Sequence, residues 1–271
     1  MSAHVLAATT SGDEDGPPVV LLHGILGSAA YWEAVTRRLP DRRTIALDLL
    51  GFGASPRPTG SAYDTADHVA AVVATLDALD LRAPVTLVGH SMGALVALRL
   101  AADHPDRVAR LVLVGMPVFA SPEAARRSLA RTPLRRALLY GPTSRALCLV
   151  WCRALRPLSR RVAALYVRRV PAAVGRATVD HSWRSYSRSL AGVVENQTAS
   201  ADLARTRCPV VVVRGDRDPD AHLPAGADAL PGVRDVLVPA WHQVPIERPD
   251  VVADAVRGSQ SAYCLARAAD C

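Results

Sequence analysis

Short apolar runs alternate with longer amphipathic stretches along the first part of the chain. Runs rich in Val, Leu and Ile predict strands at residues 18–22, 44–47, 84–88 and 108–114. Apolar residues at helical spacing predict helices at residues 65–79, 92–102 and 28–39, the last with Ser28 as its N-cap. Strands that alternate with helices favour the α/β class, with a mostly parallel central sheet flanked by helices.

The alternation stops near residue 118 and resumes near residue 207. Residues 118–206 contain no run typical of a strand, and their amphipathic segments carry paired arginines such as Arg160-Arg161. Beyond them, apolar patterns predict strands at residues 209–213 and 233–238, and helices at residues 223–230 and 250–257. We therefore predict one core, residues 1–117 and 207–271, interrupted by an all-helical insert at residues 118–206.

The formal charge of +7 over 271 residues comes from the insert. All 32 Lys-or-Arg positions hold arginine, which first indicates a GC-rich genome rather than a nucleic-acid partner. The insert holds 16 arginines against four acidic residues, whereas the rest of the chain holds 16 arginines against 21 acidic residues. Because no nucleic-acid-binding module accompanies this charge, we predict no nucleic-acid partner.

The cysteines favour a reducing compartment. Their number is odd and no signal peptide is visible, so we expect free thiols in a cytoplasmic protein. No apolar run reaches about 18 residues, so we expect no membrane-spanning helix. Cys148 and Cys152 share one face of a predicted helix, but no further ligand follows at close spacing. We therefore predict no metal site and no cofactor. The cysteines are Cys148, Cys152, Cys208, Cys264 and Cys271.

The sharpest motif is Gly89-His90-Ser91-Met92-Gly93, which follows a predicted strand and opens a predicted helix. This is G-x-S-x-G in the setting that a strained strand-to-helix turn requires. The turn projects the Ser91 hydroxyl beside a helix N-terminus, where the dipole and the Met92 N–H can stabilise an oxyanion. We predict Ser91 as a nucleophile; the alternative is a tight turn with a capping serine.

A glycine-rich loop follows the first apolar strand, at His23-Gly24-Ile25-Leu26-Gly27. Gly24 and Gly27 allow a tight backbone turn that can present the Ile25 N–H as a second oxyanion donor. The alternative is an ordinary loop between a strand and a helix.

A candidate acid and a candidate base follow the last two strands. His242 would accept the serine proton and return it to the leaving group, while an acid fixes the imidazole tautomer. His222 is a weaker candidate base, since it lies only four residues after Asp218. Three carboxylates compete for the role of acid: Asp216, Asp218 and Asp220.

Together these motifs resemble the α/β-hydrolase fold family over essentially the whole chain. The matching motifs are HGxxG at 23–27, DxxGxGxS at 48–55, GxSxG at 89–93, GxxD at 215–218, and His242 followed by ExP at 247–249. The resemblance implies Asp218 as the acid, because the family's acid ends the GxxD motif. It also implies a helical cap formed by the insert, and a short N-terminal strand pair of which residues 4–9 supply part.

Serine at the nucleophile position implies chemistry through an acyl-enzyme. The resemblance argues against the family's epoxide hydrolases and haloalkane dehalogenases, which carry Asp there. C–C hydrolases of the family commonly carry Trp after the catalytic His, where this chain has Gln243. We expect a carboxylesterase or thioesterase with a Ser91–Asp218–His242 triad. The alternatives are a triad-bearing acyltransferase, a cyclase of natural-product synthesis, or a C–C hydrolase.

Five residues are candidates for substrate binding. His23, Gly24 and His90 belong to the motifs around the serine, and Trp151 and Trp183 could line a pocket under the cap or pack within it. The histidines outside the motifs, His68 and His181 among them, are predicted as surface or packing residues.

The arginine-rich cap leaves three interpretations open. Its arginines form a solvated surface, bind an anionic or carrier-linked acyl substrate in bidentate fashion, or contact a membrane surface. We expect a small-molecule acyl substrate as the partner, and the oligomeric state is not predicted.

Overall fold

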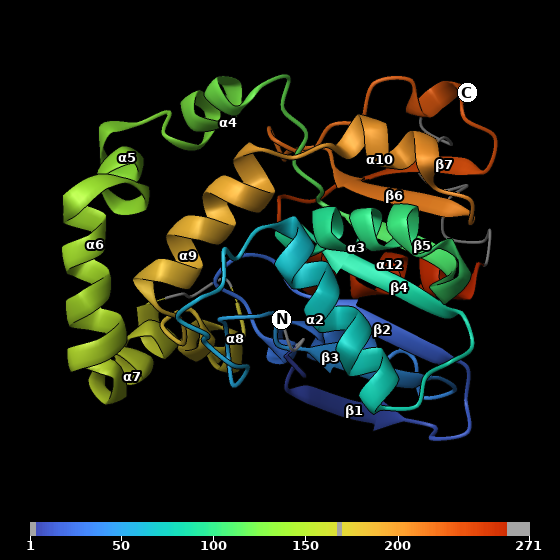
Figure 1. Ribbon diagram of the computed structural model, residues 1–271, viewed down its shortest axis with the longest axis horizontal. Coiled ribbons are helices and arrows are strands. Elements are labelled where there is room, and N and C mark those ends of the chain that lie inside the picture. The colour runs from blue at the N-terminus through green and yellow to red at the C-terminus, as the bar shows by residue number, and fades with distance from the viewer. Residues whose placement is uncertain (1–3, 167–169, 259–271) are drawn as a thin grey trace.

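A seven-stranded sheet forms the centre of the molecule (Figure 1). The computed structural model describes residues 4–166 and 170–258. The strand order is β1-β3-β2-β4-β5-β6-β7, and every neighbouring pair is parallel except β1 with β3. The predicted α/β class and mostly parallel sheet are confirmed. The strands are β1 (Ala8–Gly12), β2 (Pro18–Leu22), β3 (Arg43–Leu47), β4 (Val85–His90), β5 (Val108–Val114), β6 (Val210–Gly215) and β7 (Val233–Val238).

Helices cover both faces of this sheet, and each face has its own apolar cluster. The helices α2 and α3 pack on one face, and η1, α1 and α12 pack on the other. The helices and helical turns around the sheet are η1 (Ala29–Trp32), α1 (Glu33–Thr36), α2 (Thr65–Ala78), α3 (Met92–Asp103), η2 (Pro105–Arg107), α10 (Ala199–Arg205), η5 (Ala227–Ala229), α11 (Val244–Glu247) and α12 (Pro249–Arg257).

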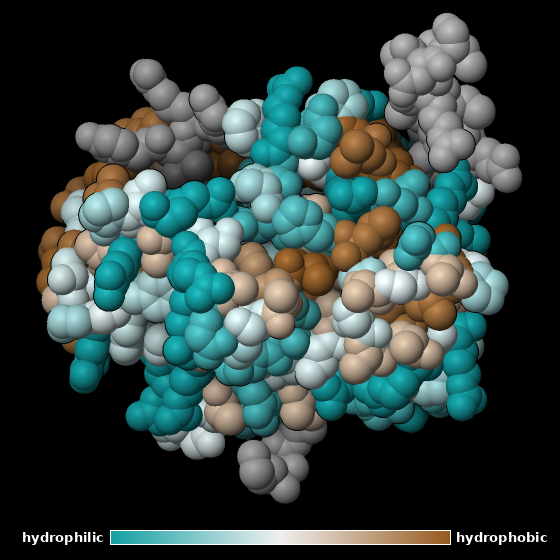
Figure 2. Space-filling view, turned by 90° about the horizontal axis from the view of Figure 1, so that it is seen from above, coloured by the Kyte–Doolittle hydropathy of each residue, from teal (hydrophilic) through white to brown (hydrophobic). Residues whose placement is uncertain are grey.

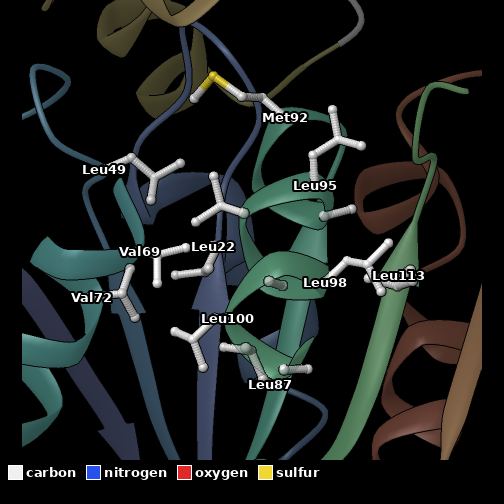
Figure 3. Packing of buried hydrophobic residues seen from close by; sticks show 14 of the residues in the cluster. Leu22, Leu49, Val69, Val72, Leu87, Met92, Leu95, Leu98, Leu100 and Leu113 are labelled. Carbon is white, nitrogen blue, oxygen red and sulfur yellow. The ribbon is translucent and has the colours of Figure 1, made fainter. Parts of the chain in front are cut away.

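The period-two geometry of a strand distributes the apolar runs between these clusters. Val20 and Leu22 of β2 face α2 and α3, while Val19 and Leu21 face the opposite cluster. Figure 3 shows Leu22 in one buried cluster with Val69 of α2 and Leu100 of α3. Because both faces are buried, the inner strands read as continuous apolar runs rather than as alternating ones, which is why they are visible in the sequence.

The N-terminal strand β1 begins near the end of the segment expected to supply it. It spans Ala8–Gly12 rather than residues 4–9 and pairs antiparallel with β3, Thr10 lying opposite Ile45. All five of its residues are exposed, so no apolar pattern marks it in the sequence.

Two predicted helices are shorter than expected. Residues 28–39 form the 3-10 turn η1 and the single turn α1, with i to i+3 backbone bonds such as Tyr31 N–H to Ser28 O, and the Ser28 side chain makes no capping bond. Apolar spacing does not distinguish these tight turns from an α-helix. Residues 223–230 contain only the turn η5, because Pro224 and the left-handed Gly226 (φ 78°) interrupt the backbone.

The described part of residues 118–206 contains helices and no strand. In Figure 1, α5, α6 and α7 form the end of the molecule away from the sheet, and α9 crosses back toward it. Ser121 and Thr132 cap α4 and α5 by accepting bonds from Ala124 N–H and Arg135 N–H. The helices are α4 (Pro122–Leu129), α5 (Pro133–Leu139), α6 (Gly141–Leu149), the π-helical turn η3 (Val150–Ala154), α7 (Arg156–Tyr166), α8 (Ala172–Ala177), α9 (Trp183–Ser189) and the π-helical turn η4 (Leu190–Glu195).

The surface of this helical part mixes apolar and hydrophilic side chains. Figure 2 shows hydrophobic patches at its end of the molecule, on the left, beside hydrophilic residues. Within the described residues, no helix is both long enough and apolar enough to cross a bilayer. Cys148, Cys152 and Cys208 are free thiols, whereas Cys264 and Cys271 lie outside the described residues.

Candidate active site

Ser91 occupies a strained turn between β4 and α3. Its backbone has φ 53° and ψ −119°, a conformation that few non-glycine residues adopt. A Cβ at Gly89 would lie 2.3 Å from the Gly93 carbonyl oxygen, and a Cβ at Gly93 would lie 2.3 Å from the Leu22 carbonyl oxygen. Only glycine fits at both positions, so the G-x-S-x-G pattern follows directly from the close approach of these backbones.

The structure brings Ser91, His242 and Asp218 into one hydrogen-bonded row. His242 Nε2 lies 3.0 Å from Ser91 Oγ, and His242 Nδ1 lies 2.6 Å from Asp218 Oδ2. Burial acts to raise the pKa of Asp218, but the hydrogen bond and charge of His242, together with the Asp220 N–H bond and the nearby His90, hold the pKa below its ordinary value. The carboxylate is therefore ionised and only accepts, so Nδ1 carries the ring proton and Nε2 is free to accept from Ser91.

The other candidate acids and the other candidate base take no part in this row. Asp216 accepts a bond from Ala240 N–H at 3.1 Å, and Asp220 pairs with Arg131 at 2.5 Å. His222 is exposed. The choice among the three carboxylates is thus made by the loop after β6, which turns only Asp218 toward the imidazole.

The two predicted oxyanion donors lie beside Ser91. Ile25 and Ser91 line the same cavity, and Met92 is the first residue of α3. Among the described residues, neither the Ile25 N–H nor the Met92 N–H donates to a protein acceptor. Gly24 keeps the loop close, since a Cβ there would lie 3.0 Å from Ser91 Cβ.

His23 holds this loop rather than lining the cavity, which corrects its predicted role in substrate binding. Its ring is fully buried; Nε2 accepts from Leu49 N–H at 2.9 Å, and Nδ1 donates to the Gly24 carbonyl at 2.7 Å. Burial lowers its pKa. A neutral imidazole with one donor and one acceptor satisfies both bonds.

His90 contacts the backbone of His242 and does not contact Ser91 Oγ or Asp218 by a hydrogen bond. Its Nε2 lies 2.9 Å from the His242 carbonyl and 3.2 Å from the Tyr31 hydroxyl. Burial and then repulsion from His242 lower its pKa to about 3, so the ring stays neutral. Tyr31 also donates to Gln243 Oε1 at 2.6 Å. This contact of Tyr31 could not be predicted from the sequence, because Tyr31 lies in an apolar pattern that also suits a core residue.

Two cavities meet at Ser91. The larger has a volume of about 830 Å³ and the smaller about 290 Å³, and Ile25, Ser91, His242 and Gln243 border both. Residues of the helical segment 118–206, which we call the cap from here on, line the larger cavity and were missed by sequence reasoning: Leu129, Arg131, Arg135, Leu190 and Val194. The smaller is lined by Gly24, Leu26, Gly27, Tyr31, His90, Val170, Val174 and Thr178. Such a site can hold an acyl group on one side of the serine and a leaving group on the other.

The two tryptophans predicted at the substrate lie elsewhere. Trp151 is 39% exposed and borders neither cavity at Ser91, because Cys152 takes the inward position of that helical turn. Trp183 borders a separate cavity of about 820 Å³ among the cap helices, with Arg126 and Arg136. Apolar periodicity places a residue on a helix face but does not say which cavity that face meets.

No group of potential metal ligands adjoins Ser91 within residues 4–166 and 170–258. The one group of potential metal ligands found in these ranges lies in the cap and consists of Cys148, Cys152 and His181. Sequence spacing could not reveal it, since His181 is 29 residues from Cys152.

Comparisons with known proteins show the family and the fold. The family model described as alpha/beta hydrolase fold matches residues 17–219. A haloalkane dehalogenase of Mycolicibacterium paratuberculosis is 31% identical over 274 residues, which cover 93% of this chain and 86% of that protein. The crystal structure of the enol-lactonase from Burkholderia xenovorans is similar with a TM-score of 0.71 at 25% identity, over 93% of this chain and 95% of that one.

A plant relative is longer. The probable lysophospholipase BODYGUARD 5 of Arabidopsis thaliana is 28% identical over 225 residues, which cover 74% of this chain and 51% of that protein. The chain thus spans about half the length of this curated relative.

Proposed function

The chain belongs to the alpha/beta hydrolase family, and from this premise we propose that it is a serine hydrolase that cleaves a carboxylic ester or thioester. One observation carries the proposal: Ser91 Oγ lies 3.0 Å from His242 Nε2, with Asp218 2.6 Å behind the ring. This is the arrangement of a nucleophile, a general base and an orienting acid.

The reaction follows from these contacts. Ser91 Oγ attacks the carbonyl carbon while its proton passes to His242 Nε2, and Asp218 stabilises the imidazolium. The N–H groups of Ile25 and Met92 bind the oxyanion. The tetrahedral intermediate collapses as His242 protonates the leaving alcohol or thiol, which leaves an acyl-enzyme. Water, deprotonated by His242, then attacks that ester and regenerates Ser91.

Dehalogenation is disfavoured by the nucleophile itself. If a carboxylate displaces a halide, the product is an alkyl ester, which water can hydrolyse at its carbonyl carbon. If Ser91 Oγ displaced the halide, the product would be an ether without a carbonyl, and turnover would stop. The similarity to a haloalkane dehalogenase therefore supports the fold and the hydrolase class, and not that substrate.

We propose that the substrate is an anionic acyl compound, free or linked to an acidic carrier, and that one arginine in the wall of the larger cavity binds its anionic group. Arg131 and Arg135 both line it, and Asp220 already neutralises Arg131. No acidic partner to the Arg135 guanidinium is found among the described residues. Two carboxylates also line the cavity and keep their charge: Asp218 contacts His242 at 2.6 Å, and Glu247 accepts the Trp241 N–H at 3.0 Å. Arg135 is thus the cation available to a carboxylate or phosphate.

A fluorophosphonate probe and p-nitrophenyl esters of graded chain length test the reaction. We expect the wild-type protein to be labelled at Ser91, and Ser91→Ala to lose both labelling and turnover. Ser187→Ala, a change in α9, is the matched control and should behave like the wild type. Labelling of Ser91→Ala at the wild-type rate would remove the nucleophile assignment.

A further inference from the structure

Two thiols and one imidazole converge inside the cap, away from Ser91. His181 Nε2 lies 3.5 Å from Cys148 Sγ and 3.6 Å from Cys152 Sγ, and the three atoms are within 4.8 Å of one another. Cys152 and His181 are each 6% exposed, and Cys148 is half-buried. None of the three lines either cavity at Ser91.

The fold holds these side chains in place from two directions. Cys148 lies in α6 and Cys152 in the turn η3, four residues apart and therefore on one helix face. His181 is held by a β-bridge to Phe52, and its ring packs against Phe52 and Tyr186 at centroid distances of 6.3 and 5.7 Å. The convergence is thus built by packing and does not depend on one flexible side chain.

Only one of the two thiols can donate a hydrogen bond to His181 Nε2. An imidazole nitrogen that accepts has one lone pair, yet two thiols face Nε2. A metal ion would use the Nε2 lone pair together with both sulfurs, so the convergence of the three atoms suits a ligand that all of them bind.

The distances match tetrahedral coordination. With zinc–sulfur bonds of about 2.3 Å and zinc–nitrogen bonds of about 2.0–2.1 Å, tetrahedral angles place sulfur and nitrogen about 3.6 Å apart. We propose that Cys148, Cys152 and His181 bind a thiophilic divalent cation, zinc being the best fit, with water as the fourth ligand. Both thiols bind as thiolates, and their two protons pass to solvent.

Such a site would join parts of the chain that are distant in sequence. It would tie α6 and η3 to the segment that precedes α9, and through Phe52 to the loop after β3. Because its ligands lie outside the cavities at Ser91, its role is to stiffen the cap and not to take part in hydrolysis.

Metal titration of the full chain tests the site. Protein stripped with a chelator under reducing conditions is titrated with Zn²⁺ against a chromophoric competitor, and with Co²⁺ in a spectrophotometer. We expect one equivalent of Zn²⁺ per chain and the near-ultraviolet charge-transfer absorption of thiolate bound to Co²⁺. Cys148→Ser and Cys152→Ser should each weaken Zn²⁺ binding by more than about tenfold.

Two control proteins separate this site from other thiols. Cys208→Ser, and the double variant Cys264→Ser with Cys271→Ser, should bind Zn²⁺ like the wild type. Zn²⁺ should also raise the melting temperature of the wild type but not that of the Cys148→Ser, Cys152→Ser double variant. Absence of the thiolate–Co²⁺ absorption in the wild type would overturn the proposal without reliance on any variant, as would unchanged Zn²⁺ affinity in the folded double variant.

Discussion

At the scale of single residues, the proposed reaction needs one histidine to stay neutral beside another that becomes charged. The rings of His90 and His242 are 4.9 Å apart. A charged His90 would oppose the imidazolium that the proposed reaction creates on His242. Burial holds the pKa of His90 at about 3, so its ring contributes a hydrogen bond to the His242 carbonyl and no positive charge.

Replacing the acid tests the proposed division of roles. Asp218→Asn should lower kcat by about 10³- to 10⁴-fold, because an amide can donate to His242 Nδ1 and so favour the wrong tautomer. Ester turnover under single-turnover and steady-state conditions measures this loss. Asp216→Asn is the control, since Asp216 binds the Ala240 amide and not His242. Equal losses in both variants would contradict the assignment of Asp218.

A second buried histidine predicts how stability depends on pH. Burial, with a smaller effect of His23, lowers the pKa of His68 from 6.5 to about 4. As the pH falls below about 6.5, His68 binds a proton in the unfolded chain but stays neutral in the folded one. The free energy of unfolding therefore decreases between pH 6.5 and about 4, by up to about 3 kcal/mol.

Urea unfolding of wild type and His68→Gln at pH 7.5 and pH 4.5 measures this term. The variant should lose less stability than the wild type between the two pH values, whatever its stability at pH 7.5. If the two proteins lost equal stability, His68 would not be the group responsible.

At the scale of elements, the turn from β4 to α3 shows why part of the site can be predicted from the sequence. Gly89 and Gly93 are required by backbone contacts, and backbone contacts are common to every chain that makes this turn. The same holds for Gly53, where a Cβ would lie 2.1 Å from Asp48 Oδ2, a carboxylate that accepts the Ala29 and Ala54 amides. Because such backbone contacts require glycine, they produce motifs from which the fold and this part of the site can be predicted.

Gly93→Ala should disrupt this turn severely. Its Cβ would meet the Leu22 and His23 carbonyl oxygens at 2.3 and 2.5 Å, and neither backbone can move without displacing β2. We expect loss of esterase activity and a lowered melting temperature or insoluble expression. Gly60→Ala, where a Cβ meets nothing within 4 Å, should leave both unchanged. A fully active Gly93→Ala would show that the turn tolerates a side chain.

Elements that depend on side-chain partners distant in the chain were less predictable. The apolar spacing of residues 28–39 is real, yet the backbone forms tight turns there, and Tyr31 reaches Gln243 across the site. In the cap, Trp151 and Trp183 were expected at the substrate, while Leu129 and Val194 line the cavity instead. Apolar residues serve a cap interior and a cavity wall equally, so a single sequence does not separate the two.

At the scale of the whole molecule, the positive charge is concentrated in one segment, and one arginine of that segment without an acidic partner among the described residues lines the cavity at Ser91. The segment 118–206 holds 16 arginines against four acidic residues. Several of them are already paired: Arg126 with Glu195, Arg131 with Asp220 and Arg160 with Asp180. Most of the excess therefore acts at long range, where salt screens it, whereas Arg135 lies in the wall of the cavity that contains Ser91.

A pair of esters separates the long-range effect from direct binding. For p-nitrophenyl hemisuccinate, which keeps a free carboxylate, we expect kcat/KM to fall as NaCl rises from about 0.05 to about 0.5 M, because the cap no longer attracts the anion. For neutral p-nitrophenyl butyrate, kcat/KM should stay nearly constant. Equal responses would mean that the cap charge does not act on substrate.

Arg135→Gln should raise KM for the hemisuccinate by about tenfold or more, since a bond between a guanidinium and a carboxylate is lost, and should leave the butyrate unchanged. Arg145→Gln is the matched control: it removes the same charge from an exposed cap position that borders neither cavity at Ser91. If both variants changed KM equally, the arginines would act only as a diffuse field. If only Arg135→Gln did so, the anion is bound in the cavity itself, next to Ser91, the proposed nucleophile.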